Sequence, residues 1–263
     1  MINNYKKFRI PILRKSEMAR DSQTGNSIVK KVTYVGPEII RNVLLISVIL
    51  LITLSSFNKE SEGCSVTDYG IDISHHNGII AWDTVRKYND IQFVYIKATE
   101  GATHVDKRYA QNVKGASSAG FRIGSYHYFR MTSSAHDQFR NFISTISKYN
   151  QDLLPMVDVE TTDKHSITET RDSLNVFISL VKAYFGKEPM IYGLNDSYNN
   201  ICGPTYNGYK LYIGLPGSNP PVIKGNGNYV IWQFSNNGKI RGIPSPVDLA
   251  RFNNQYTIED ILL

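Results

Sequence analysis

The sequence predicts an α/β fold: one irregular, TIM-like barrel built from about eight strands with helices between them. Beyond residue 68, short runs rich in aromatic and β-branched residues alternate with longer stretches of helical periodicity. Helical periodicity becomes sparse after Gly186, where Gly, Pro and Asn dominate the connections. The chain shows no internal repeat and no low-complexity tract. We therefore expect a single domain over residues 68–263, whose later part consists mostly of strands and loops.

Each expected element rests on its own pattern of side chains. The expected strands are Tyr69–Ile73, Gln92–Ile96, Arg122–Tyr128, Leu153–Val159, Met190–Tyr192, Lys210–Ile213, Tyr229–Phe234 and a short one at Pro246–Leu249. The expected helices are Ala81–Tyr88, Lys107–Ala119, Ala135–Lys148 and Ile167–Tyr184. In the third of these helices, for example, Phe139, Phe142 and Ile146 recur at helical spacing and share one face.

Acidic residues follow several of the expected strands. They are Asp72, Glu100, Asp158, Glu160 and Asp248. The chemistry of such barrels lies at the C-terminal ends of the strands, where the loops form one face. These five acids are therefore the first candidates for a functional site.

The segment Pro155–Glu160 places Asp158 and Glu160 two residues apart at the end of an apolar strand. Side chains two apart in a strand point to the same face, about 6.6 Å apart along the chain. One ionised carboxylate raises the pKa of its neighbour, so the pair can hold one acid and one base. Glycoside hydrolysis uses such a pair. The alternative is a salt-bridged pair at the surface.

The other polar residues near the strand ends have simpler alternatives. Asp72 could serve as a turn or helix-capping residue, and Lys97 offers an ion pair to Glu100. His127 should face the opposite side from its neighbours in the strand and pack in the core. The six histidines are too scattered to assemble a zinc site of the two-His-one-acid kind, and no metal is expected.

Aromatic side chains at the strand ends are candidates for stacking on sugar rings, because aromatic faces pack against the apolar faces of pyranoses. The expected substrate-binding set is Tyr126, Tyr128, Tyr192, Trp232 and Gln233. Trp82 lies in an expected helix, so we expect it in the core.

The net charge of +6 lies entirely in residues 1–41, which carry nine basic and three acidic residues, whereas the rest of the chain is balanced. A neutral domain with a basic tail lacks the footprint of a nucleic-acid binder. Residues 42–58 are uncharged and are expected to anchor the chain in the membrane, with 59–67 as a linker. The alternatives are a cleaved signal segment and a buried helix. The basic tail would stay cytoplasmic and the domain would face the other side, or be exported after cleavage.

The chain has two cysteines, Cys64 and Cys202, too few for a four-ligand metal site or a disulfide-rich scaffold. In an oxidising compartment they could pair, and they could equally remain free thiols.

A set of ordered motifs spans the whole of the expected domain. The motifs are YGIDISHHNG, FVYIKATEG, GFRIGSYHYFR, LPMVDVE, PMIYG, LYIG and IWQFS, followed by VDLARF. Together they resemble glycoside hydrolase family 25, the Chalaropsis-type lysozymes, over residues 68–253. The resemblance implies a flattened barrel of eight strands with about five helices. It also implies hydrolysis of the β-1,4 bond between N-acetylmuramic acid and N-acetylglucosamine in peptidoglycan glycan strands, by a monomer without metal or organic cofactor.

The resemblance assigns roles to four of the acids. Glu160 matches the proton donor, and Asp158 matches the partner that either attacks the anomeric carbon or stabilises an intermediate made by the substrate's acetamido group. Asp72 and Asp248 would line the cleft, while Glu100 would have a structural role. Ile80-Ala81-Trp82 departs from the family's frequent Ile-Asp-Trp at a helix start. A chitinase-like enzyme of family 18 would want an acid where Met156 stands, and a silent glycan-binding barrel would not need Glu160.

Overall fold

The computed structural model describes residues 69–263. The basic tail (1–41), the apolar segment (42–58) and the linker (59–67) lie outside the described residues, as does Cys64. In the described part of the chain, no helix combines the length and the apolar character needed to cross a bilayer.

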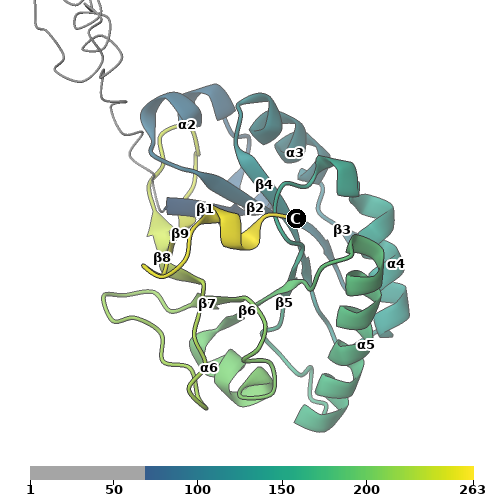
Figure 1. Cartoon of the computed structure of the whole chain (residues 1–263). Coiled ribbons are helices and arrows are strands. Elements are labelled where there is room, and N and C mark those ends of the chain that lie inside the picture. Colours follow the sequence, from purple (N-terminus) through teal and green to yellow (C-terminus); the bar gives the residue numbers. More distant parts are fainter. Residues whose placement is uncertain (1–68) are drawn as a thin grey trace, which may run out of the picture. The chain divides into compact units, whose positions relative to one another are not determined.

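Eight strands close into a barrel, which confirms the predicted fold class (Figure 1). They are β1 (Tyr69–Ile73), β2 (Phe93–Glu100), β4 (Arg122–Tyr128), β5 (Met156–Asp158), β6 (Met190–Leu194), β7 (Leu211–Gly214), β8 (Ile231–Gly238) and β9 (Val247–Phe252). Neighbours from β1 through β8 are parallel, and β9 closes the barrel by pairing antiparallel with both β8 and β1. A short strand, β3 (His104–Val105), adds to the edge of β2.

Helices occupy the connections of the first part of the barrel. They are α2 (Trp82–Tyr88), α3 (Tyr109–Ser118), α4 (Ala135–Thr145), α5 (Ile167–Phe185) and the short α6 (Asn195–Ser197). Figure 1 shows α3, α4 and α5 along one side of the barrel, whereas the later strands are joined by loops. The distribution follows the loss of helical periodicity after Gly186.

The longest helix, α5, is specified at both ends by local chemistry. The Ser166 side chain accepts from the backbone N–H of Glu169, and the Glu169 carboxylate accepts from the backbone N–H of Ser166. This capping box satisfies backbone groups that a helix start leaves without partners. Gly186 ends the helix in the left-handed conformation, with φ of 80°, which glycine adopts without steric cost.

Several element boundaries differ from the sequence-based expectation, by four residues at the ends of β2 and β8. The strand expected at Leu153–Val159 is reduced to β5, because Leu153 forms a bridge with Leu262 near the C-terminus instead. The helix expected to reach Lys148 ends at Thr145, where Ile146 takes an extended conformation. The last strand continues to Phe252 because its whole length pairs with β8 and β1.

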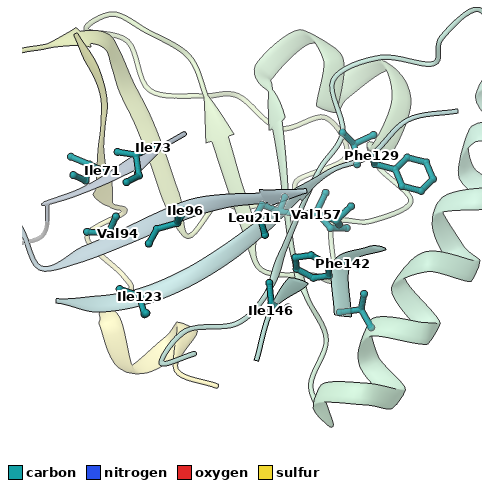
Figure 2. Close-up of a cluster of buried hydrophobic side chains, with 14 of the residues drawn as sticks. Ile71, Ile73, Val94, Ile96, Ile123, Phe129, Phe142, Ile146, Val157 and Leu211 are labelled. Carbon is teal, nitrogen blue, oxygen red and sulfur yellow. The ribbon is translucent and has the colours of Figure 1, made fainter. Parts of the chain in front are cut away.

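Two apolar cores lie on the two faces of the barrel sheet. The outward side chains of the strands pack against side chains of the helices, and Figure 2 shows Val94 and Ile96 of β2 in this cluster together with Phe142 of α4. The inward side chains form a second, aromatic-rich core that includes Phe93, Tyr95 and Tyr212. Toward the C-terminal ends of the parallel strands, the inward side chains are polar instead of apolar. Those polar residues form the candidate site.

Candidate active site

A cavity of about 200 Å³ lies where the inward side chains at the strand ends converge. Eight of the nine residues expected at the site line it: Asp72, Asp158, Glu160, Asp248, Tyr126, Tyr128, Tyr192 and Gln233. The remaining lining residues are Ser74, His76, Lys97 and Met156. Side chains from seven strands thus meet at one place, although the sequence spreads them over more than 170 positions.

Asp158 and Glu160 reach the cavity from the end of β5. Asp158 lies between Tyr128 of β4 and Tyr192 of β6 in the sheet register and is 5% exposed. Among the described residues, its buried Oδ1 has no hydrogen-bond partner. Glu160 is half-buried, and its Oε2 accepts a hydrogen bond of 3.4 Å from the Tyr128 hydroxyl. The deeper carboxyl group therefore has an oxygen free for a ligand, and the shallower one has a neutral donor beside it.

The surroundings favour the protonated forms of both side chains. Burial raises the pKa of Asp158 well above its usual value, and the neighbouring Glu160 charge raises it further. Burial likewise raises the pKa of Glu160, while Tyr128 and Lys97 oppose that rise. Two such close carboxyl groups titrate as a pair. The pair is thus able to hold one proton and one negative charge.

On the other side of the cavity, Asp72 of β1 and Asp248 of β9 form a second carboxyl pair. They are direct partners across the antiparallel β1–β9 ladder. Burial, and then the charge of Asp248, raise the pKa of Asp72, which is hydrogen-bonded to Asp248. The Tyr212 hydroxyl donates to Asp72 Oδ2 at 2.7 Å. These surroundings favour the protonated form of Asp72, with the Asp248 carboxyl group beside it as acceptor.

Gln233 extends this network to the next strands. Its side chain is hydrogen-bonded to Asp248, which lowers the pKa of Asp248 against the larger effect of burial. The Tyr192 hydroxyl donates to Gln233 Oε1 at 2.6 Å. A Cβ on Gly214 would stand 2.6 Å from Gln233 Oε1 and 2.7 Å from the Tyr192 hydroxyl oxygen. Glycine at position 214 therefore leaves the space in which Tyr192 and Gln233 meet.

Trp232 is the one expected site residue that the structure places elsewhere. Its side chain is 3% exposed, its Nε1 donates to the Leu215 carbonyl at 2.8 Å, and its ring lies under the Arg251 guanidinium at 4.5 Å. Successive side chains of a strand point to opposite faces. Since Gln233 points into the barrel, Trp232 points out of it, and the expectation that it lines the sugar cleft does not agree with this geometry.

Glu100 and His127 have the structural environments expected of them. Glu100 accepts from Lys97 Nζ at 2.7 Å and from Arg130 Nη1 at 2.9 Å. His127 is fully buried on the outer face of β4, hydrogen-bonded to Thr99 and Gln138. Burial lowers the pKa of His127 to about 4, so the ring stays neutral.

Lys97, Ser74, His76 and Met156 line the cavity although the sequence analysis did not select them. Met156 lies two positions before the acid Asp158, and Lys97 lies two positions after the inward aromatic residue Tyr95. For these two residues the alternation of side chains in the strand therefore provided a signal. Within residues 69–263, no group of three or more His, Cys, Asp or Glu side chains is placed to hold a metal ion.

Comparison with known sequences connects this cavity with a family. The model of the glycosyl hydrolases family 25 matches residues 71–243. Lysozyme M1 of Streptomyces globisporus is 32% identical over 201 residues, covering 70% of this chain and 67% of that protein. The uncharacterized protein YegX of Escherichia coli K12 is 33% identical over 201 residues, covering 75% of this chain and 73% of that protein.

The fold gives the same result. The crystal structure of a bacterial lysozyme from Streptomyces coelicolor superimposes with a TM-score of 0.66 at 30% identity. The match covers 75% of this chain and 96% of that structure, so the likeness extends over nearly the whole of that lysozyme.

Proposed function

Because this chain belongs to the glycosyl hydrolases family 25 and is a peptidoglycan muramidase, we propose that Glu160 and Asp158 perform its chemistry. In this proposal Glu160 donates a proton to the glycosidic oxygen between N-acetylmuramic acid and N-acetylglucosamine. Asp158 either attacks the anomeric carbon or stabilises an intermediate formed by the substrate's acetamido group. Either role requires a negative charge beside a developing oxocarbenium ion.

The observation that carries the proposal is the arrangement at the end of β5. Asp158 and Glu160 share one wall of the cavity, and Asp158 Oδ1 has no partner among the described residues. Glu160 lies nearer the solvent, beside the Tyr128 hydroxyl, where a glycosidic oxygen has access. Burial raises the pKa of both groups, which lets the pair keep a proton for donation.

Asp72, Asp248 and Gln233 support the pair from the opposite wall. We assign them to holding the sugar rings and to setting the negative charge of the cavity, together with the tyrosines at positions 126, 128 and 192. Tyrosine rings offer both an apolar face for a pyranose and a hydroxyl for its polar edges.

The deciding experiment is the release of reducing sugars from purified peptidoglycan, with chitin as a parallel substrate. The parent protein is expected to release reducing ends from peptidoglycan and the Glu160→Gln variant to lose about 10²–10⁴-fold in turnover while still binding glycan. Asp158→Asn is expected to lose most activity as well, because an amide carries no charge. A Glu160→Gln variant within threefold of the parent would favour the silent glycan-binding barrel instead, and preferential cleavage of chitin would favour a chitinase-like enzyme.

The location of the enzyme is proposed from the sequence, since residues 42–58 lie outside the described part of the chain. The uncharged segment 42–58 follows a basic tail, a pattern that keeps the tail cytoplasmic and puts the catalytic domain across the membrane. Membrane fractionation of the full-length protein, followed by protease added from outside the cytoplasmic membrane, tests this. Full-length, uncleaved protein free in the cytosol would contradict it.

A further inference from the structure

The cavity holds four carboxyl groups but few cations. Among the described residues that line it, Lys97 is the one lysine or arginine. Its side chain is 14% exposed, and its ammonium group lies 4.9 Å from the centre of the Tyr128 ring. Holding a cation there has a desolvation cost, which its surroundings must offset.

The contact between Lys97 and Glu100 depends on a β-bulge in β2. In the pairing with β4, Lys97 lies opposite Tyr126 and Thr99 opposite His127, so Ala98 is an extra residue. Without that extra residue, Lys97 and Glu100, three positions apart, would point to opposite faces of the strand. The bulge turns Glu100 to the side of Lys97. As a result, Lys97 Nζ reaches Glu100 Oε2 at 2.7 Å.

Glu100 is itself held by a longer chain of charges. Arg130 Nη1 donates to Glu100 Oε1 at 2.9 Å. The same guanidinium donates to both oxygens of Asp163, at 3.0 and 2.8 Å, and Asp163 also accepts from the Met131 backbone N–H at 2.8 Å. These bonds join the end of β2, the segment after β4 and the loop after β5. A two-pronged Arg–carboxylate contact fixes geometry as well as charge.

We propose that Lys97, held in place by Glu100, Arg130 and Asp163, is a positioning residue that supplies a fixed positive charge to the Asp158–Glu160 pair. The inference rests on the proposed roles of those two acids. Burial raises the pKa of both carboxyl groups and so favours their protonated forms. The Lys97 ammonium lowers the pKa of each of them. Arg130 and Lys97 both bind the Glu100 carboxylate. The single negative charge of Glu100 therefore neutralises Lys97 only in part, and part of the positive charge of Lys97 acts on the cavity.

Other groups act on the same pair, and the test must separate them from Lys97. The titratable or charged side chains facing the pair are Asp72, His76, Glu100, Tyr126, Tyr128, Tyr192 and Asp248. Behind them, Tyr212 is bonded to Asp72 and Arg130 to Glu100. Burial raises the pKa of the tyrosines among them, so they stay neutral donors. The charges that then act on the pair are those of the Lys97–Glu100–Arg130 chain and that of Asp248.

The two members of the Lys97–Glu100 ion pair give opposite predictions. Lys97→Met removes a positive charge and is expected to raise the apparent pKa values of the Asp158–Glu160 pair by about one unit. Glu100→Gln removes a negative charge that raises the pKa of Asp158 and is expected to lower that value. Lys97→Arg keeps the charge and is expected to leave both values near those of the parent. If the ion pair were merely structural, Lys97→Met and Glu100→Gln would have the same effect.

The experiment is a carboxyl-carbon NMR titration of the full chain without substrate, with Asp158 and Glu160 assigned from their amide variants. A pH profile of kcat/KM on soluble peptidoglycan fragments accompanies it. Both limbs of the Lys97→Met profile should move to higher pH, and activity on the acid side should fall about tenfold for each pH unit that the acid limb moves. The titration does not depend on turnover, so it distinguishes a failure of this inference from a failure of the proposed function.

Two results would overturn the inference. One is a Lys97→Met titration that coincides with that of the parent, and the other is a Glu100→Gln variant whose pKa values move in the same direction as those of Lys97→Met. If Lys97→Met does not fold, the direction of the change in Glu100→Gln decides alone, because glutamine still accepts from Lys97 and Arg130.

Discussion

Asp72 and Asp248 are direct partners across the β1–β9 ladder, and the Tyr212 hydroxyl donates to Asp72 Oδ2 at 2.7 Å. Two carboxyl groups at such a cross-strand position would repel each other if both were ionised. A proton on Asp72, which burial and the charge of Asp248 favour, removes that repulsion. The charge of Asp248 raises the pKa of Glu160, although burial of Glu160 has the larger effect.

The first prediction concerns the charge on Asp248. Asp248→Asn should move the alkaline limb of the kcat/KM profile to lower pH, because Glu160 then loses its proton more easily. Activity at alkaline pH should fall more than activity at the acid end. Asp172→Asn serves as the control, since it removes an exposed carboxylate of α5 outside the cavity. An alkaline limb that stays in place in Asp248→Asn would show that this charge does not act on Glu160.

The second prediction separates packing from binding at Trp232. Because the indole is buried beside Arg251 and bonded to the Leu215 carbonyl, Trp232→Ala should lower the free energy of unfolding by about 3–5 kcal/mol. KM for peptidoglycan fragments should stay unchanged for the fraction that is folded. Urea unfolding and steady-state kinetics at low temperature measure the two quantities.

Trp232→Phe is the matched control, because it keeps one aromatic ring but removes the N–H that bonds Leu215 and the second ring of the indole. It should cost more than the roughly 1 kcal/mol of one hydrogen bond and less than Trp232→Ala. If Trp232→Ala leaves stability unchanged and raises KM, Trp232 contacts the sugar as the sequence analysis expected.

The third prediction concerns the start of α2. Ala81 is the N-cap residue, is exposed, and makes no side-chain hydrogen bond to the helix. An aspartate at this position would accept from a backbone N–H of the first turn, so Ala81→Asp should raise the free energy of unfolding by about 0.5–2 kcal/mol. The melting temperature should rise by about 2–4 °C per kcal/mol in a domain of this size.

Ala81→Leu, which offers no acceptor, is the control for that gain. Since Ala81 does not line the cavity, kcat should stay unchanged in both variants. An Ala81→Asp protein that melts no higher than Ala81→Leu would show that the cap is already satisfied by other means.

These residues also show what could be predicted from the sequence. The eight strands, and the four acids of the cavity, could be predicted from the sequence. Each acid directly follows or ends an apolar run, and parallel strands bring such ends together. Trp232 and Gln233 are adjacent in β8, so both could not point into the barrel. Choosing between them needed the register with Tyr212 and Gly214.

The geometry of the Lys97–Glu100 ion pair, unlike the pair itself, could not be predicted from the sequence. Strict alternation puts Lys97 and Glu100 on opposite faces, and the β-bulge that brings them together arises from pairing with β4. A register shift depends on the neighbouring strand and its turns rather than on the residues of β2 alone. The same applies to the end of β5, where Leu153 pairs with Leu262, a residue more than a hundred positions away.

The last prediction connects activity with stability at Asp158. Burial and the Glu160 charge raise the pKa of Asp158 in the folded protein above the value of about 3.9 of an unfolded chain. The folded state therefore binds the proton more tightly, and between these two pKa values the free energy of unfolding falls as pH rises. Above the pKa of Asp158 in the folded protein, the side chain is ionised in both states, and the loss of unfolding free energy no longer grows with pH.

Asp158→Asn cannot ionise, so it should be more stable than the parent at pH 7–8, and this gain should grow with pH up to the folded pKa of Asp158 and then level off. The difference should vanish near pH 3, where Asp158 is protonated in both states. Urea unfolding of parent, Asp158→Asn and Asp172→Asn across this range measures it, and Asp172→Asn should follow the parent because that side chain is exposed. An Asp158→Asn protein less stable than the parent at neutral pH would mean that the ionised carboxylate has partners that offset its burial. The expected outcome, an inactive but more stable protein, would show that this site keeps a destabilising charge because the chemistry needs it.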